Sequence, residues 1–191
     1  MKLLLISGSA RKESYNAKLA AAAAKLASAQ GVETDLVAAA DLRLPLYDGD
    51  LEEIEGLPTA VVALKARFLA ADAVLFACPE YNSSITPLLK NLIDWVSRAG
   101  SDSEAPLAAY KGKVAGLVSA SPGALGGMRG LVTVRSILGN IGVLVVPTQF
   151  ALGKAHEAFD TEGNLSNDSA KKSLAAVVNE VIRVAKAIAG K

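Results

Sequence analysis

The sequence contains few of the residues that form disulfides, metal centres or aromatic clusters. Of its 191 residues, one is cysteine and one is histidine, and aromatic residues make up 5%. A single cysteine excludes an internal disulfide and is typical of the reducing cytoplasm, where we expect the protein to act. Because cysteine and histidine do not cluster, the sequence predicts no metal site.

The sequence also lacks an excess of one charge and a long apolar run. Its formal net charge is +1, which predicts neither a basic surface for nucleic acid nor an acidic tail. No apolar run approaches the length of a membrane span. The apolar start of the chain is too short for an export signal, and Arg11 and Lys12 follow it closely. We therefore expect neither nucleic acid nor a membrane as a partner.

Apolar runs typical of strands alternate with runs typical of helices along the whole chain. Apolar residues make up 51% of the sequence, enough for one domain over residues 1–191. Strands are predicted over residues 2–7, 32–37, 73–78, 113–119 and 142–147, and helices over residues 15–30, 58–70, 86–98, 127–140 and 166–189. The strands are continuously apolar, so the pattern predicts a doubly wound α/β domain whose parallel sheet is covered on both faces.

The turn after the first predicted strand is suited to binding an anion. A helix N-terminus attracts phosphate through its free N–H groups and its partial positive charge. Gly8 permits a tight turn, and polar donors follow it at Ser9, Arg11, Ser14 and Asn16. The turn contains neither a dinucleotide fingerprint nor an NTP-cleaving P-loop. A phosphate site is favoured over the simpler alternative, in which Ser14 only caps the helix.

A second polar loop, residues 79–86, follows the third predicted strand. Tyr81 is suited to stacking on a planar ring, and Asn82, Ser83 and the backbone N–H groups of residues 80–83 to bonding its polar atoms. Alternatively Tyr81 packs locally, Asn82 forms an Asx-turn, Ser83 or Ser84 caps the helix and Glu80 is a solvated charge. In the flavodoxin-like strand order 2-1-3-4-5, this loop and the first meet at the switch-point crevice. Together they predict a mononucleotide site.

A third loop, residues 119–130, follows the fourth predicted strand. Its glycines permit close approach of a ligand, and Ser121 is placed to donate to a ring carbonyl. A flexible glycine-rich loop is an equally good interpretation. Arg129 binds either a second anion or another subunit.

Several single residues favour structural interpretations. Cys78, in an apolar run, is interpreted as a buried structural thiol, and His156 as a surface residue. Trp95 is interpreted as a packing residue more than as a contact for a cofactor ring, with a subunit-interface anchor as a further alternative. Lys90 and Asp94 are spaced for a weak helical ion pair. Expected helix caps are Thr86, followed by Pro87 at the first helical position, and Asn164 or Ser166 for the last helix.

Together the three loops resemble the NADPH-dependent FMN reductase family, which includes chromate and quinone reductases and azoreductase-like enzymes. The resemblance covers residues 3 to about 150 and is carried by three motifs. These are Gly8-Ser9-x-Arg11-x-x-Ser14-x-Asn16, Pro79-Glu80-Tyr81-Asn82-x-Ser84-x-x-Pro87-x-Leu89-Lys90-Asn91-x-Ile93-Asp94-Trp95, and Gly126-Gly127-Met128-Arg129. The second motif is long enough to be highly specific.

The resemblance implies a flavodoxin-like three-layer α/β/α fold with a five-stranded parallel sheet that holds FMN without a covalent link. It implies phosphate contacts from Ser9, Arg11, Ser14 and Asn16, and ring contacts from Glu80, Tyr81, Asn82, Ser83 and Ser121. Tyr15 and Pro79, within the same motifs, complete the predicted cofactor-binding set. The family also implies a homodimer or a dimer-of-dimers tetramer. Val132 and Gln149 stand where some chromate-reducing relatives carry acidic and aromatic interface partners, so that network is not expected here.

The implied activity is that of an NAD(P)H-dependent oxidoreductase. Hydride would pass from NADPH or NADH through FMN to quinones or similar small-molecule acceptors, such as chromate, azo compounds or free flavin, in a ping-pong cycle. No catalytic side chain is predicted, because the flavin carries the reactivity. The alternatives are a flavodoxin-type electron carrier and a flavin-free regulatory protein. Arg11 in the phosphate loop and the near-neutral charge favour the enzyme over the carrier.

Overall fold

A five-stranded parallel sheet forms the centre of the molecule. The computed structural model describes residues 1–190, so the last residue of the predicted domain, Lys191, lies outside the described residues. The strands follow the order β2-β1-β3-β6-β7, with bounds Glu33–Leu36, Lys2–Ser7, Ala73–Ala77, Val114–Ala120 and Leu144–Leu152. Every neighbouring pair is parallel. Counted along the chain, this is the predicted order 2-1-3-4-5.

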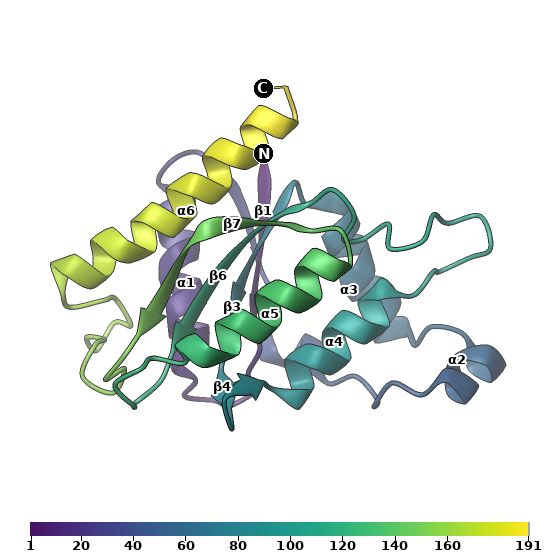
Figure 1. Cartoon of the computed structure of the whole chain (residues 1–191), viewed down its shortest axis with the longest axis horizontal. Helices are drawn as coiled ribbons and strands as arrows, with labels where there is room; N and C mark the ends of the chain where they lie inside the picture. Colours follow the sequence, from purple (N-terminus) through teal and green to yellow (C-terminus); the bar gives the residue numbers. More distant parts are fainter. Residues whose placement is uncertain (191) are drawn as a thin grey trace.

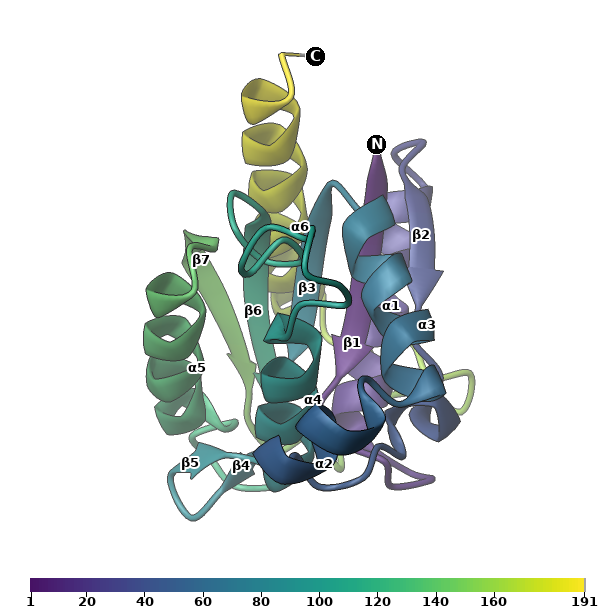
Figure 2. The same cartoon turned by 90° about the vertical axis from the view of Figure 1, so that its right-hand side faces the viewer.

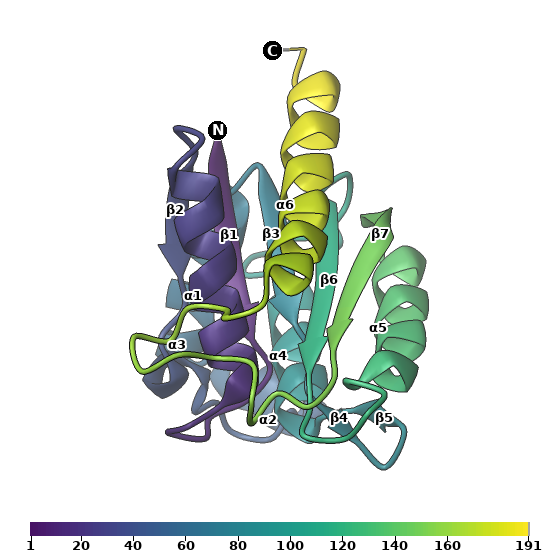
Figure 3. The same cartoon turned by 90° about the vertical axis from the view of Figure 1, so that its left-hand side faces the viewer.

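Helices cover both faces of the sheet. α1 (Tyr15–Ser28) and α6 (Asp168–Ile188) pack on one face, where they lie in front of the strands in Figure 3. α3 (Thr59–Ala70), α4 (Pro87–Ser97) and α5 (Met128–Asn140) pack on the other, and Figures 1 and 2 show this second layer. The three-layer α/β/α arrangement is thereby confirmed.

The strands are continuously apolar because each face has its own core. On β1, Leu3 and Leu5 belong to the cluster under α1 and α6, whereas Leu4 and Ile6 belong to the cluster under α3, α4 and α5. Successive side chains of a strand point to opposite faces, so a sheet covered twice needs an apolar residue at every position. All four leucine and isoleucine side chains are fully buried.

Strand β7 continues beyond its predicted end at residue 147. A register shift separates the Ala115–Val145 pair from the Leu117–Gln149 pair, so the strand bulges around Pro147 and then resumes. The guanidinium of Arg135 donates to the carbonyls of Val145 and Val146 at 3.2 and 3.0 Å. Arg135 thus binds backbone carbonyls of β7 at the point where the register shifts. The polar stretch after the proline therefore remains part of the strand.

Other local differences concern helix ends and short elements. The last helix is capped by Asn167, whose side chain accepts from Ser169 and Ala170, so the predicted caps Asn164 and Ser166 are wrong. The chain also forms elements that the pattern does not predict: a 3₁₀ turn η1 (Ala39–Leu42), helix α2 (Gly49–Glu55), and a hairpin of β4 (Glu80–Tyr81) and β5 (Ser84–Ile85).

Helix α4 agrees with its sequence signals. The Thr86 hydroxyl accepts from the Leu89 N–H, and Pro87 occupies the first turn, as predicted. Trp95 is fully buried, its indole donates to the Pro45 carbonyl at 2.8 Å, and its ring meets Tyr47 edge to face. Packing is therefore confirmed for Trp95, and a subunit anchor is wrong. The ion pair of Lys90 with Asp94 is present at 2.8 Å.

Within residues 1–190, no helix combines the length and the apolar character needed to cross a membrane. In the same range, no group of three or more histidine, cysteine or acidic side chains is placed to hold a metal ion.

The close packing of α6 on β6 gives a test of the fold. A Cβ on Gly116 would lie 2.6 Å from Val181 Cγ2, so Gly116→Ala should destabilise the protein by about 1–3 kcal/mol through overpacking. Gly139→Ala is the matched control. Nothing lies within 4 Å of that site in α5, and the change should stabilise the protein by about 0.5–1 kcal/mol. Urea unfolding measures both, and equal stability of the two variants would contradict the packing described.

Candidate cofactor-binding site

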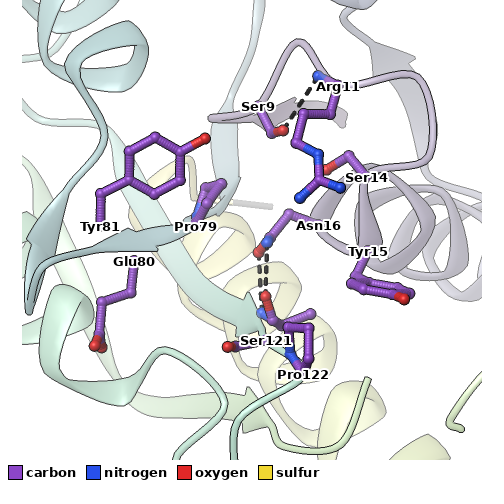
Figure 4. A pocket seen from close by; sticks show the side chains of 11 residues that line it. Ser9, Arg11, Ser14, Tyr15, Asn16, Pro79, Glu80, Tyr81, Ser121 and Pro122 are labelled. Atoms are coloured by element: carbon purple, nitrogen blue, oxygen red, sulfur yellow. Dashed lines mark hydrogen bonds between the residues drawn. The ribbon is translucent and has the colours of Figure 1, made fainter. Parts of the chain in front are cut away.

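One pocket lies at the carboxyl ends of β1, β3 and β6, where the three predicted loops meet. Ligands bind at this edge in open α/β sheets because the strand order reverses there. Figure 4 shows the residues that line it, which are Ser9, Arg11, Ser14, Tyr15, Asn16, Pro79, Glu80, Tyr81, Ala120, Ser121 and Pro122. Asn82 and Ser83 are exposed and do not line it. The fold thus brings most of the predicted contacts together from segments far apart in the sequence.

The first turn of α1 forms the anion-binding end of the pocket. Ser14 is the N-cap, and its hydroxyl accepts from the Ala17 N–H at 3.2 Å. The N–H groups of Tyr15 and Asn16 form no hydrogen bond within residues 1–190. The first N–H groups of a helix have no partner within the helix, so they can bind a ligand. Ser14 therefore does cap the helix, while the next two N–H groups stay available to an anion.

Arg11 adds a positive charge to this end. Its guanidinium points toward Ser14 and the start of α1 in Figure 4. No carboxylate within residues 1–190 forms an ion pair with Arg11. The preceding turn is held by the Ser9 hydroxyl, which accepts from the Arg11 N–H at 3.3 Å. A forked cation beside free backbone donors is the geometry that binds phosphate.

Asn16 links the first loop to the third. Its Nδ2 donates to the Ala120 carbonyl at 2.8 Å, and its Oδ1 accepts from the Ala120 N–H at 3.0 Å. The side chain is buried, and both bonds join the start of α1 to the end of β6. Fixing these two elements is thus the role visible here, and a direct contact of Asn16 with phosphate stays a prediction.

The second loop folds as a hairpin with a two-residue turn. Tyr81 pairs with Ser84, and Asn82 and Ser83 between them have φ values of 51° and 66°. Two positive φ values are typical of the type I′ turn that joins tightly twisted strands. Tyr81 is 52% exposed and its ring lies across the pocket from Arg11 in Figure 4. Asn82 and Ser83 therefore build the turn, and their ring contacts stay predictions.

The side chain of Glu80 leaves β4 on the side opposite to Tyr81 (Figure 4). Its carboxylate accepts from the guanidinium and the N–H of Arg129 and from the N–H of Gly130. Burial would raise the pKa of Glu80, but these hydrogen bonds outweigh it and lower that pKa. The Glu80 side chain is only 8% exposed, so its interpretation as a solvated loop charge is wrong. For Arg129, the structure shows an ion pair within the chain.

The glycines of the third loop serve the chain's own packing. Gly126 and Gly127 have φ values of 63° and 87°. A Cβ on Gly126 would lie 2.7 Å from the backbone of residues 151–153, so this turn presses against the end of β7. Ser121 lines the pocket, and its hydroxyl accepts from the Gly123 N–H at 3.2 Å. The loop is thus held in place, which disfavours the flexible interpretation.

Cys78 and His156 lie outside the pocket lining. Cys78 is fully buried, and burial raises the pKa of its thiol, which confirms a structural residue. The side chain of His156 is 48% exposed and lies 3.0 Å from Glu157, as expected for a surface histidine.

Comparison with known proteins identifies the family. Residues 1–157 match the NADPH-dependent FMN reductase family. The chain is 37% identical over 179 residues to a probable NADPH:quinone oxidoreductase 2 of Oryza sativa subsp. japonica, covering 91% of this chain and 83% of that protein. It is 37% identical over 174 residues to an NAD(P)H-dependent FMN reductase of Pseudomonas aeruginosa, covering 90% and 88%.

A solved structure agrees with these sequence matches. FerB, a flavoenzyme NAD(P)H:acceptor oxidoreductase from Paracoccus denitrificans, is similar with a TM-score of 0.83 and 30% identity, over 97% of both chains. The sequence motifs, the flavodoxin-like strand order and these matches lead to one assignment. The chain belongs to the NADPH-dependent FMN reductase family and is a quinone-reductase-like, NAD(P)H-dependent oxidoreductase.

Proposed function

We propose that the protein holds FMN non-covalently in the described pocket and uses NADPH or NADH to reduce quinones or similar small-molecule acceptors. The observation that carries this proposal is the joining of two kinds of surface in one pocket. Free helix N–H groups and Arg11 form one end, and the half-exposed ring of Tyr81 lies across from them. A phosphate at the first end and a planar ring at the second are what FMN offers.

The residues present fit FMN at both ends. Arg11 offers a permanent positive charge to the phosphate, beside the hydroxyls of Ser9 and Ser14. Pro79 and Tyr81 on one side, and Ser121 and Pro122 on the other, bound the space for the ring. Ring contacts from the backbone of residues 80–83 remain part of the proposal.

The chain's part in the reaction is to bind and to align. When bound, FMN would supply the hydride-accepting and electron-donating chemistry. Arg11 offsets the phosphate charge, and the loop walls hold the two reacting partners close and aligned. We propose no catalytic side chain. The nicotinamide and the acceptor would use the same exposed side of the pocket in turn, which gives a ping-pong cycle.

The comparisons support a reductase over the electron carrier, because relatives that match about nine tenths of this chain are named as reductases or oxidoreductases. Chromate, azo compounds and free flavin belong to the proposed range of acceptors. We also propose a homodimer or a dimer-of-dimers tetramer that acts in the cytoplasm. The exposed apolar side chains of Leu46 and Ile54, on the segment packed beside α4, support a subunit contact there.

Arg11→Ala tests the phosphate end. Loss of one charge-assisted contact should weaken FMN binding by about 1–3 kcal/mol, which corresponds to a Kd about 5- to 150-fold higher. Quenching of flavin fluorescence on titration with apoprotein measures the Kd. Riboflavin, which has no phosphate, should bind both proteins equally. Lys12→Ala is the control, because Lys12 is exposed and does not line the pocket. An unchanged Kd for FMN in Arg11→Ala would reject the phosphate role.

Steady-state kinetics test the reaction cycle. With FMN bound, initial rates measured against a benzoquinone at several fixed NADPH concentrations should give parallel double-reciprocal lines, as a ping-pong cycle requires. The same series with NADH gives the nicotinamide preference. Intersecting lines would contradict alternating use of one site. If neither nicotinamide bleaches the bound flavin without oxygen, the electron-carrier alternative is favoured instead.

A further inference from the structure

Helix α5 begins without a capping side chain of its own. Its N-cap is Gly127, which has a φ of 87° and offers no side-chain acceptor. An N-cap side chain normally accepts from the N–H of the second or third helical residue, which here are Arg129 and Gly130. Here the Glu80 carboxylate accepts both at its Oε2, at 3.0 and 3.1 Å. Glu80 therefore caps α5 from a different element, the hairpin strand β4.

The second oxygen of the same carboxylate binds the arginine side chain. Oε1 of Glu80 accepts from Arg129 Nε at 2.9 Å and from Arg129 Nη2 at 2.5 Å. The Glu80 carboxylate thus binds both the positive guanidinium of Arg129 and the N-terminus of α5. Its negative charge lies where the helix dipole favours it. The Glu80 side chain is 8% exposed and that of Arg129 is 56% exposed, so the carboxylate is shielded from solvent while the guanidinium reaches it.

The glycines at the start of α5 allow the hairpin to lie directly against the helix. A Cβ on Gly130 would lie 3.2 Å from the Ser84 carbonyl oxygen and 3.4 Å from Glu80 Cβ. A Cβ on Gly127 would lie 3.1 Å from Ser119 Cβ. A larger residue at Gly130 would press on the hairpin, whereas one at Gly127 would press first on β6. Gly130 and the carboxylate of Glu80 therefore serve the same contact.

This contact lies directly behind the part of the pocket assigned to the ring. Tyr81 follows Glu80 in β4, and their side chains point in opposite directions (Figure 4). Both residues line the pocket, but the Glu80 carboxylate is bound to the start of α5. The loop that leads into α5 carries Ser121 and Pro122 on another wall of the pocket. Fixing β4 to the start of α5 therefore fixes one pocket wall relative to another.

We propose that Glu80 is a positioning residue for the flavin ring: its carboxylate joins the hairpin that carries Tyr81 to the start of α5 and sets the place of the ring without touching it. This inference rests on the proposed function, since it needs a flavin in the pocket. It gives the Glu80 carboxylate a role other than contact with the ring, while a ring contact from the Glu80 backbone stays part of the proposed function. It also gives Arg129 a role within the site's own subunit.

The test compares FMN with riboflavin, because the two share the ring and differ in the phosphate. In Glu80→Ala, the Kd values of both should rise by the same factor, on the order of tenfold (about 1.4 kcal/mol of binding free energy), because the ring wall is no longer held in place. In Arg11→Ala, only the Kd of FMN should rise. Visible circular dichroism of the bound flavin should change in Glu80→Gln. Glu157→Gln, at an exposed carboxylate, is the matched control and should leave both measurements unchanged.

A second variant keeps the test valid if Glu80→Ala does not fold. Arg129→Gln leaves both backbone N–H contacts of the cap in place and removes only the guanidinium. It should change the flavin dichroism in the same sense as Glu80→Gln, and the double variant should add little to either single change. This non-additive result would support the positioning role.

Two outcomes would overturn the inference in distinguishable ways. If Glu80→Gln and Arg129→Gln unfold at lower temperature but bind riboflavin with the wild-type Kd and dichroism, Glu80 only stabilises the fold. If the wild-type protein itself binds neither FMN nor riboflavin, the proposed function fails, and the inference fails with it. The first outcome leaves the proposed function intact, because the wild-type protein binds the flavin in that case.

Discussion

Three largely buried side chains hold the carboxyl edge of the sheet together by bonding to the backbone of another segment of the chain. Thr86 donates to the Gly8 carbonyl at 2.8 Å, Asn16 bonds both backbone groups of Ala120, and Glu80 accepts from the first turn of α5. The first loop, the hairpin and the starts of α1, α4 and α5 lie outside the strand ladder of the large sheet, so that sheet does not fix their separation. Without such bonds, buried backbone groups at this edge would lack partners.

The same bonds form the walls of the pocket before any ligand arrives. A site whose loops are already held loses less conformational freedom on binding than a site that must order them. Thr86 illustrates how one side chain serves two purposes: it caps α4 by accepting from Leu89 and ties the first loop by donating to Gly8. The start of α4 and the phosphate turn consequently form one unit. A Cβ on Gly8 would press on Leu89 and Pro79 and so push the turn away from α4.

The sequence predicts the sheet, its order and the composition of the pocket, because these depend on strong local signals. Continuous apolar runs identify the strands, and a Pro87 after Thr86 identifies the start of α4. The roles of Asn16 and Glu80 depend instead on partners 104 and 49 residues away, which no local pattern indicates. The hairpin turn is hidden for a similar reason, since Ser83 adopts a positive φ that its residue type rarely favours.

The polar residues of the motifs form two groups, according to what their side chains contact. The side chains of Arg11 and Tyr81 face the pocket, whereas those of Asn16 and Glu80 bond to the backbone of β6 and α5. A reaction whose chemistry belongs to a cofactor depends on alignment more than on a reactive side chain. For such a site the second group matters as much as the first, because a small shift between β4 and α5 would move a pocket wall that the cofactor ring is proposed to meet.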